Sequence, residues 1–116
     1  MINQSILTIS HFTALITTKN ISNDTEVING CGEYIIKNLN LHIVNKIHHA
    51  FLPQGKTIVY ILSESHLAIH TWPEKNTIHV DLISCKNTTE SLAKKTFIEA
   101  FSRFIVTDCL FKKHDF

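Results

Sequence analysis

Glycine and proline are scarce in this sequence, with three and two copies among 116 residues, and no stretch has the composition of a flexible linker. Hydrophobic residues make up 44% of the chain and charged residues 18%, a balance that excludes a largely disordered protein. A chain of this length can build one hydrophobic core but not two. We therefore expect residues 1–116 to form a single domain.

An excess of positive or negative charge is also missing, because the formal net charge is only +1. This balance gives no general electrostatic attraction to nucleic acid or to an anionic membrane. The first residues, MINQSILTISHFTALITTK, lack a basic start and are interrupted by Ser, His and Thr, so they predict neither a signal peptide nor a membrane-spanning helix. We expect a cytoplasmic protein that binds neither nucleic acid nor membranes.

Cysteine pairs with the spacing of a disulfide framework or a zinc knuckle are missing as well. Cys31, Cys85 and Cys109 form an odd set without a C-x-x-C pair, which predicts reduced thiols. His66 and His70 have the spacing that chelates zinc on a helix, but their surroundings favour a strand, in which four residues span about 13 Å. We therefore expect no metal site.

Runs of β-branched and aromatic residues predict six strands, at residues 6–17, 41–50, 57–62, 67–72, 77–83 and 104–111. The segment FLPQGK and the segment PEKN supply turn residues between neighbouring strands. The sheet is expected to be largely antiparallel, because several of these strands follow one another with only short connections.

Apolar residues at helical spacing predict two helices, at residues 27–39 and 92–104. Asn23 or Asp24 is expected to cap the first helix, and Asn87 opens a capping box for the second. The predicted order is β-α-β-β-β-β-α-β. Both helices can then lie on one face of the sheet, so the predicted fold is an α+β two-layer sandwich.

The run ILSESHLAIHTWPE concentrates serines, a glutamate and two histidines at the start of one predicted strand. Strand alternation places His66, Ala68 and His70 on one face. Leu67 and Ile69 take the other face, where they can join the core. The histidine face is therefore predicted to remain free for chemistry.

Ser65 begins this strand at a corner where its hydroxyl can approach the carbonyl of Glu64. A serine hydrolase of the nucleophile-elbow type needs the pattern G-x-S-x-G and an acid that orients the base. The segment SESHL contains no glycine, so the sequence does not favour that class of enzyme.

The block SESHLAIHTWPE, with FLPQG before it and DLISC after it, closely resembles the prokaryotic S-adenosylmethionine decarboxylase proenzymes. The resemblance extends from about residue 11 to residue 111. It implies a pyruvoyl-dependent decarboxylase that acts on S-adenosylmethionine and makes the aminopropyl donor for spermidine synthesis. It also implies a homodimer of cleaved protomers, with sites near the interface and no cofactor other than the pyruvoyl group.

The resemblance assigns a role to each residue of the expected reaction centre. It implies self-cleavage between Glu64 and Ser65, after which Ser65 becomes the pyruvoyl group that forms a Schiff base with the substrate amine. His70 matches the processing histidine, and Cys85 matches the catalytic proton donor. Thr57 stands where the family usually has a serine, so the processing hydroxyl is retained with an added methyl group.

Three further residues match positions near the family's substrate pocket. Phe51 and Trp72 supply aromatic faces, over which a sulfonium cation gains on the order of 1 kcal/mol. Glu74 matches the carboxylate expected at the ribose hydroxyls. These residues favour a ligand like S-adenosylmethionine.

The chain departs from the family pattern at two basic positions. Ser10 and Ala50 stand where the family usually has basic residues, and these changes bear on the identity of the substrate. The same pyruvoyl chemistry on arginine or ornithine is therefore one alternative. A second alternative, from another class, is an unprocessed relative that binds a nucleoside or regulates a partner subunit.

Overall fold

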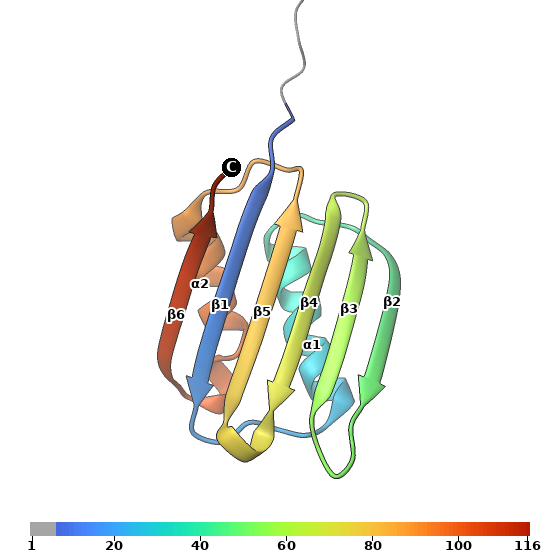
Figure 1. The fold of residues 1–116 in the computed structure, drawn as a ribbon, viewed down its shortest axis with the longest axis vertical. Helices are drawn as coiled ribbons and strands as arrows, with labels where there is room; N and C mark the ends of the chain where they lie inside the picture. The colour runs from blue at the N-terminus through green and yellow to red at the C-terminus, as the bar shows by residue number, and fades with distance from the viewer. Residues whose placement is uncertain (1–6) are drawn as a thin grey trace, which may run out of the picture.

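Six strands form one antiparallel sheet, and both helices lie on the same side of it (Figure 1). The structure, a computed structural model, describes residues 7–116. It confirms the predicted order of elements and the α+β two-layer sandwich. Along the chain the elements are β1 (Ser10–Thr18), α1 (Thr25–Asn38), β2 (Ile43–Ala50), β3 (Lys56–Leu62), β4 (Ser65–Trp72), β5 (Thr77–Ser84), α2 (Glu90–Ala100) and β6 (Val106–His114), with short 3-10 turns η1 (Pro73–Lys75) and η2 (Ser102–Phe104).

The position of β4 inside the sheet determines where the predicted site residues lie. The strands follow the spatial order β2-β3-β4-β5-β1-β6, and each neighbouring pair is antiparallel. Along β4 the pairing with β5 runs from Ser65 opposite Ser84 to Trp72 opposite Thr77. The β3–β4 turn lies at one end of the sheet, and the β2–β3 loop lies at the other (Figure 1). The first and last residues of β4 therefore belong to opposite ends of the molecule.

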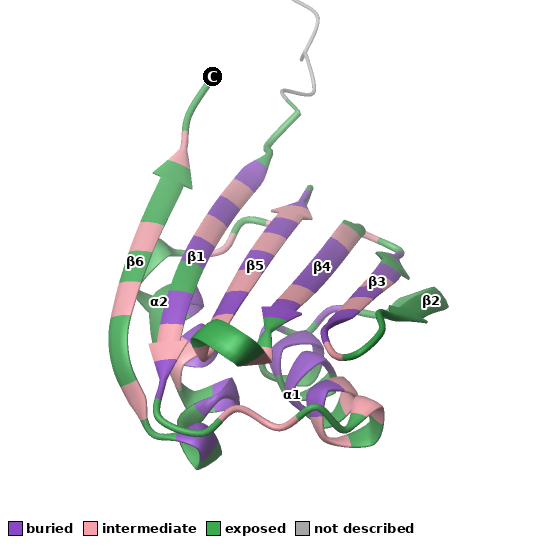
Figure 2. Ribbon diagram, turned by 60° about the horizontal axis from the view of Figure 1, so that its bottom comes forward, coloured by how far each residue is buried: buried purple, intermediate pink, exposed green. Residues whose placement is uncertain are grey.

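Alternating burial divides the sheet into a covered face and an open face (Figure 2). Leu67 and Ile69 are fully buried beneath the helices, as the alternation predicts, whereas His66 and His70 lie half-buried on the open face. The largest fully buried side chains are Phe12, Ile16, Ile28, Ile35, Ile58, Tyr60, Leu67, Ile69, Ile78, Leu82, Phe97 and Phe101. Because this core is closely packed, it fixes β4 and with it the positions of the residues on the open face of that strand.

The caps of the two helices differ in how well the sequence predicted them. Asp24 caps α1, and its carboxylate accepts a hydrogen bond from the Glu26 N–H at 2.8 Å. For α2 the predicted cap at Asn87 is wrong, because the Thr89 hydroxyl accepts from the Leu92 N–H instead. Ser10 Oγ accepts from the Thr88 N–H and donates to the Lys86 carbonyl, and this contact holds the preceding residues outside the helix.

The second helix is shorter than its apolar spacing indicated. It ends at Ala100 rather than at residue 104, and η2 follows. Ile105 adopts φ 60°, a left-handed conformation that ends any helical continuation. The last strand therefore starts at Val106, and its pairing with β1 extends to His114 opposite His11.

The remaining strand boundaries lie within two residues of the prediction, except at the start of β1 and at the end of β6, which extends to His114 rather than to residue 111. That strand begins at Ser10, and Ile6, where the prediction began, lies outside the described residues. Every residue of β2 is exposed, because β2 is an edge strand that neither helix covers fully. In the described part of the chain, no helix is both long and apolar enough to cross a membrane.

Candidate active site

The predicted site residues divide into two groups at opposite ends of β4. Ser65 is the first residue of this strand and His70 is the sixth, so about 17 Å of extended chain separates their Cα atoms. We call residues 63–65 the processing turn. The other group lines a pocket beside the β2–β3 loop, which we call the loop pocket.

The processing turn contains the peptide bond between Glu64 and Ser65. The Cys85 N–H donates a hydrogen bond of 2.8 Å to the carbonyl oxygen of Glu64. This contact follows from the register, because Ser65 pairs with Ser84 and Cys85 comes next along the chain. Ser65 and Cys85 are both exposed. A backbone donor therefore already polarises the carbonyl that the Ser65 hydroxyl would attack.

The backbone at Ser65 has an uncommon conformation. Its φ angle is 147°, in the region that glycine adopts readily and other residues rarely do. Such a conformation costs on the order of 1–3 kcal/mol and persists only where the surroundings enforce it. The neighbouring strands supply this constraint, since Ser65 pairs with Leu62 on β3 and with Ser84 on β5.

The Glu64 side chain is directed to the start of β2. Its carboxylate contacts the imidazole Nδ1 of His42 at 2.8 Å and accepts the His42 backbone N–H at 3.0 Å. The hydrogen bond from the His42 side chain is the main reason that the pKa of the Glu64 carboxyl lies below its usual value. Glu64 is therefore ionised at neutral pH and acts as a hydrogen-bond acceptor.

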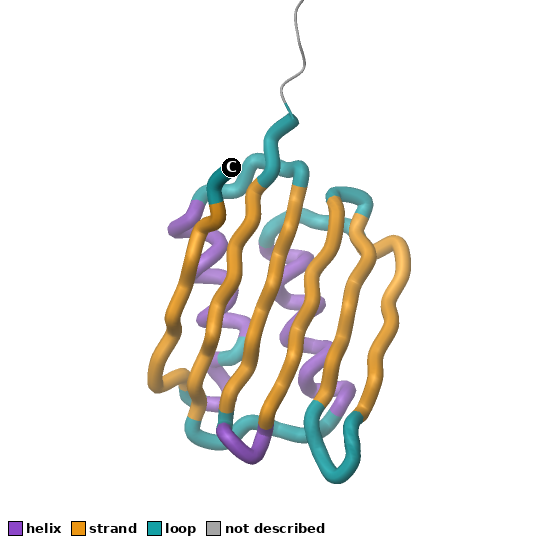
Figure 3. Tube along the Cα trace, viewed as in Figure 1, coloured by secondary structure: helices purple, strands orange, loops and turns teal. Residues whose placement is uncertain are grey.

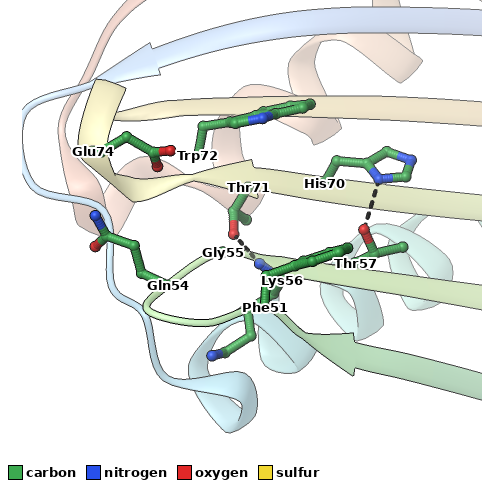
Figure 4. A pocket seen from close by; sticks show the side chains of 9 residues that line it. All are labelled: Phe51, Gln54, Gly55, Lys56, Thr57, His70, Thr71, Trp72 and Glu74. Carbon is green, nitrogen blue, oxygen red and sulfur yellow. Dashed lines mark hydrogen bonds between the residues drawn. The ribbon is translucent and has the colours of Figure 1, made fainter.

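The loop pocket is an open hollow of about 340 Å³ at the other end of β4. The β2–β3 loop and η1 lie at the same end of the sheet (Figure 3), and residues of both line this hollow. In Figure 4, Phe51 and Trp72 flank the pocket, and the Thr57–His70 pair closes one side. The residues that line it are Phe51, Gln54, Gly55, Lys56, Thr57, His70, Thr71, Trp72 and Glu74.

Gly55 allows the β2–β3 loop to fold against the end of β4. It adopts φ 107°, a conformation that favours glycine. Its carbonyl accepts the Phe51 N–H at 2.9 Å, and its N–H donates to the Asn23 side chain at 3.0 Å. A Cβ atom at this position would lie only 3.3 Å from the carbonyl oxygen of Thr71. The glycine therefore lets the loop close and holds the backbone of Phe51, a residue that lines the pocket.

Thr57 and His70 form a hydrogen-bonded pair on the open face. They lie opposite each other on β3 and β4, and Thr57 Oγ1 lies 2.9 Å from His70 Nδ1. Burial lowers the pKa of His70 below its ordinary value, and the neighbouring His79 adds to this effect, whereas Asp81 opposes it. His70 is therefore neutral at physiological pH and able to accept a proton.

Two aromatic rings and a carboxylate complete the loop pocket. The Phe51 residue is 49% exposed and Trp72 is 43% exposed, so both present apolar surface to a ligand. Glu74 lies in η1, directly after β4, and Asn76 ends this turn in a left-handed conformation. The pocket can therefore hold a ligand that has a flat or cationic group and hydroxyl groups.

The structure brings together some of the predicted residues and separates others. Thr57, His70, Phe51, Trp72 and Glu74 share the loop pocket. The processing turn and Cys85 lie at the other end of β4. In one chain, His70 is thus remote from the bond that it is expected to help cleave.

Sequence reasoning did not select several residues of the two sites. Lys56 and Thr71 occupy positions on the covered face of their strands, and Lys56 is only 7% exposed. Both nevertheless border the pocket, which lies at the end of these strands. Gln54 lies in the FLPQG segment, which signals a turn but no ligand contact. His42 was not selected from the sequence either, because no spacing signal links it to Glu64 across 22 positions. Among residues 7–116, no three histidine, cysteine or acidic side chains are arranged to hold a metal ion.

Comparisons with known proteins identify the family of this chain. The family described as S-adenosylmethionine decarboxylase matches residues 11–107. A protein of Archaeoglobus fulgidus named S-adenosylmethionine decarboxylase proenzyme is 34% identical over 77 residues, which are 66% of this chain and 69% of that protein. A proenzyme of the same name from Clostridium botulinum is 40% identical over 68 residues, which are 59% of each chain.

A solved structure is similar over most of the chain. The crystal structure of the adenosylmethionine decarboxylase from Aquifex aeolicus matches with a TM-score of 0.78 and 26% identity, covering 91% of this chain and 88% of that one. The family match covers both the processing turn and the loop pocket. The resemblance of the SESHLAIHTWPE block is thereby confirmed, and the chain belongs to the S-adenosylmethionine decarboxylase family.

Proposed function

We propose that this protein is a proenzyme that cleaves itself between Glu64 and Ser65 and then decarboxylates S-adenosylmethionine, which yields the aminopropyl donor for spermidine synthesis. The hydrogen bond from the Cys85 N–H to the Glu64 carbonyl carries this proposal, because it stabilises negative charge on the oxygen that attack at the carbonyl creates. The family match and the names of the relatives support the same reaction.

Self-cleavage begins at the processing turn. The Ser65 hydroxyl attacks the carbonyl carbon of Glu64, the C–N bond breaks, and an ester and a free Ser65 amine result. A base then removes the α-proton of Ser65, and the main-chain carboxylate of Glu64, the new C-terminus, leaves with the electrons of the Cβ–O bond. The dehydroalanine that remains takes up water and loses ammonia to become the pyruvoyl group. The positive φ angle of Ser65 favours the first step, because bond cleavage releases that backbone constraint.

His70 and Thr57 fit the proton transfers of this sequence, but they cannot serve the Ser65 of their own chain across about 17 Å. The proposal therefore includes a homodimer, in which the Thr57–His70 pair of one chain faces the processing turn of the other. A twofold axis would complete two equal sites, since each chain carries both halves. The open face supports this arrangement, because Leu15, Ile61 and Leu110 are 40%, 44% and 60% exposed.

The residues around Ser65 fit a pyruvoyl group, since Ser65 follows a polarised carbonyl and its β5 partner Ser84 directly precedes Cys85. Such a group supplies a carbonyl that condenses with the substrate amine and accepts the electrons released as carbon dioxide leaves. Cys85 is exposed, and we assign to it the donation of a proton to the former α-carbon of the substrate. Delivery of that proton to the carbon of the pyruvoyl group instead would inactivate the enzyme, so the placement of this thiol determines turnover.

The loop pocket supports the choice of substrate. Phe51 and Trp72 offer aromatic faces to a sulfonium cation and an adenine ring, and Glu74 offers a carboxylate to ribose hydroxyls. Arginine and ornithine have neither a ring nor hydroxyl groups and would use these features far less. S-adenosylmethionine is thus the better fit. Decarboxylation of arginine or ornithine is the second candidate. It is favoured by Ser10 and Ala50, which stand where the family usually has basic residues.

Intact-mass spectrometry of the purified chain tests the first half of the proposal. We expect a 64-residue fragment that ends at Glu64 and a 52-residue fragment with a blocked pyruvoyl amino end. The Ser65→Ala variant is the matched control and should remain a single chain. Persistence of only the full-length wild-type protein would instead support the unprocessed binding or regulatory relative.

Release of labelled carbon dioxide tests the second half. We expect release from S-adenosylmethionine well above release from arginine or ornithine, and none from the Ser65→Ala variant. Release from arginine or ornithine alone would replace the substrate and leave the self-cleavage reaction intact.

A further inference from the structure

His42 contacts the processing turn at three points. Its N–H and its imidazole Nδ1 bind the two carboxylate oxygens of Glu64, at 3.0 and 2.8 Å. Its carbonyl oxygen accepts the Ser63 N–H at 2.9 Å. One residue thus holds both the residue at the scissile bond and the residue before it.

The hydrophobic core supports this histidine. Leu41 is 5% exposed, and its N–H donates to the Ile36 carbonyl at 2.9 Å, which ties the segment before His42 to the end of α1. The residue after it, Ile43, pairs with Leu62 on β3. His42 is therefore held on both sides, although its own side chain is 66% exposed. The Glu64 side chain, at 16% exposed, lies beneath it.

We infer that His42 is a positioning residue for self-cleavage. Its two hydrogen bonds to the Glu64 carboxylate, here called the grip, keep the scissile carbonyl against the Cys85 N–H. This inference rests on the proposed self-cleavage at Glu64. The His42 ring contacts the Glu64 carboxylate, so His42 acts through Glu64 and not on the reacting atoms.

The strain at Ser65 explains why the turn needs this grip. A residue at φ 147° relaxes toward common backbone angles unless neighbouring contacts prevent it. Relaxation would rotate the Glu64 peptide plane and move its oxygen away from the Cys85 N–H. A small displacement of a reacting carbonyl has a large effect on rate, because attack requires close alignment of the two atoms.

The charge on Glu64 maintains the grip across the neutral range. Its hydrogen bond to His42 lowers the pKa of the Glu64 carboxyl, so the carboxylate remains an acceptor for both His42 donors. A neutral imidazole with its proton on Nδ1 donates in the same way as an imidazolium. An asparagine side chain can place an N–H near the position of the imidazole Nδ1, and this makes a conservative rescue variant available.

The experiment follows self-cleavage of full-length chains made by cell-free synthesis, with intact-mass spectrometry of samples taken over time. We expect His42→Ala to cleave about tenfold more slowly than wild type, the loss typical of a removed hydrogen bond to a charged group. His42→Asn should cleave at close to the wild-type rate. His48→Ala, at another exposed histidine on the same segment, should not differ from wild type.

A double-mutant cycle distinguishes this grip from a general loss of stability. Glu64→Gln should slow cleavage by itself, and the combined His42→Ala/Glu64→Gln variant should be no slower than His42→Ala. Thermal unfolding of these variants in an uncleavable Ser65→Ala background should change little. If His42→Ala does not fold, the rates of Glu64→Gln and His42→Asn decide the question, because both variants keep a polar side chain at positions 42 and 64.

The possible outcomes separate the two proposals. Absence of cleavage in wild type would overturn the proposed function, and with it this inference. Cleavage of wild type together with an equal rate for His42→Ala, or with a wild-type rate for Glu64→Gln, would overturn the role of His42 alone. Additive slowing in the cycle, or failure of His42→Asn to restore the rate, would also overturn it.

Discussion

The two ends of β4 are built in different ways. At the processing turn, backbone hydrogen bonds hold an exposed and constrained peptide, and the Cys85 N–H to Glu64 carbonyl contact is the central one. At the loop pocket, side chains form the site, since Phe51 and Trp72 line its walls and Thr57 is hydrogen-bonded to His70. One end presents the peptide bond that we propose is cleaved, and the other presents the residues that we propose as base and ligand surface.

On the proposed function, the two ends are halves of one site. The processing turn holds the proposed nucleophile and a polarised carbonyl, whereas His70, the proposed base, lies about 17 Å along the strand. His70 lines the loop pocket instead. Two copies related by a twofold axis would supply each half with its counterpart, and the predictions below test this division.

The largest expected effect is complementation between two inactive chains. Ser65→Ala has no nucleophile, and His70→Ala lacks the base, so we expect no cleavage of the first and about 10²- to 10⁴-fold slower cleavage of the second. When both are produced in the same cell, a mixed dimer contains one Ser65 opposite one intact His70. Mass spectrometry should then find the His70→Ala chain cleaved and the Ser65→Ala chain whole.

Two controls sharpen this result. The double variant Ser65→Ala/His70→Ala should not rescue His70→Ala, because it contributes neither the nucleophile nor the base. Rapid cleavage of His70→Ala without any partner chain would contradict the division into half-sites and would require a base from the processing end itself.

The second prediction separates cleavage from turnover at the processing end. Cys85→Ala removes the thiol but leaves the backbone N–H that polarises Glu64. Self-cleavage should therefore continue, whereas carbon dioxide release should fall by about 10²- to 10⁴-fold, the loss expected for a positioned acid. Wild-type turnover in Cys85→Ala, measured on fully cleaved protein, would show that the proton comes from another group.

The sequence predicted most of the fold because its strands alternate strongly. Leu67 and Ile69 on one side of β4 and His66 and His70 on the other were sufficient to assign the covered and open faces. The helix ends were harder, because tertiary contacts decide them. The Ser10 hydroxyl, distant in sequence, holds the segment before α2 and moves its cap to Thr89.

The candidate site was predictable in its members but not in its layout. The SESHLAIHTWPE block indicated Ser65, His70, Trp72 and Glu74, and strand geometry alone implies that the first two are far apart. The contact between Cys85 and Glu64 depends on the register between β4 and β5, which no local pattern encodes. The His42 contact depends on how β2 enters the sheet, which is a property of the whole fold.

The third prediction concerns ligand binding at the loop pocket. Glu74→Gln keeps the shape of η1 but removes the charge, so hydrogen bonds to ribose hydroxyls should weaken by about 1.5–3 kcal/mol. The KM for S-adenosylmethionine should rise about ten- to a hundredfold, and the rate of self-cleavage should not change. A change in self-cleavage with an unchanged KM would move Glu74 from substrate binding to the processing machinery.

The smallest expected effect is a shift in pH dependence at the pocket end. Burial lowers the pKa of His70, and His79, whose ring centroid lies 6.2 Å away, contributes in the same direction, whereas Asp81 opposes both. A base must be neutral to accept a proton, so the cleavage rate falls as the pH falls through this pKa.

His79→Ala removes a like charge and admits water, which raises the pKa of His70 and moves the acid limb of the profile to higher pH. Asp81→Asn removes an opposite charge and should move the same limb to lower pH. Cleavage rates of both variants across the acidic and neutral range provide the measurement, and shifts of equal sign, or none, would mean that His70 is not the base whose titration limits self-cleavage.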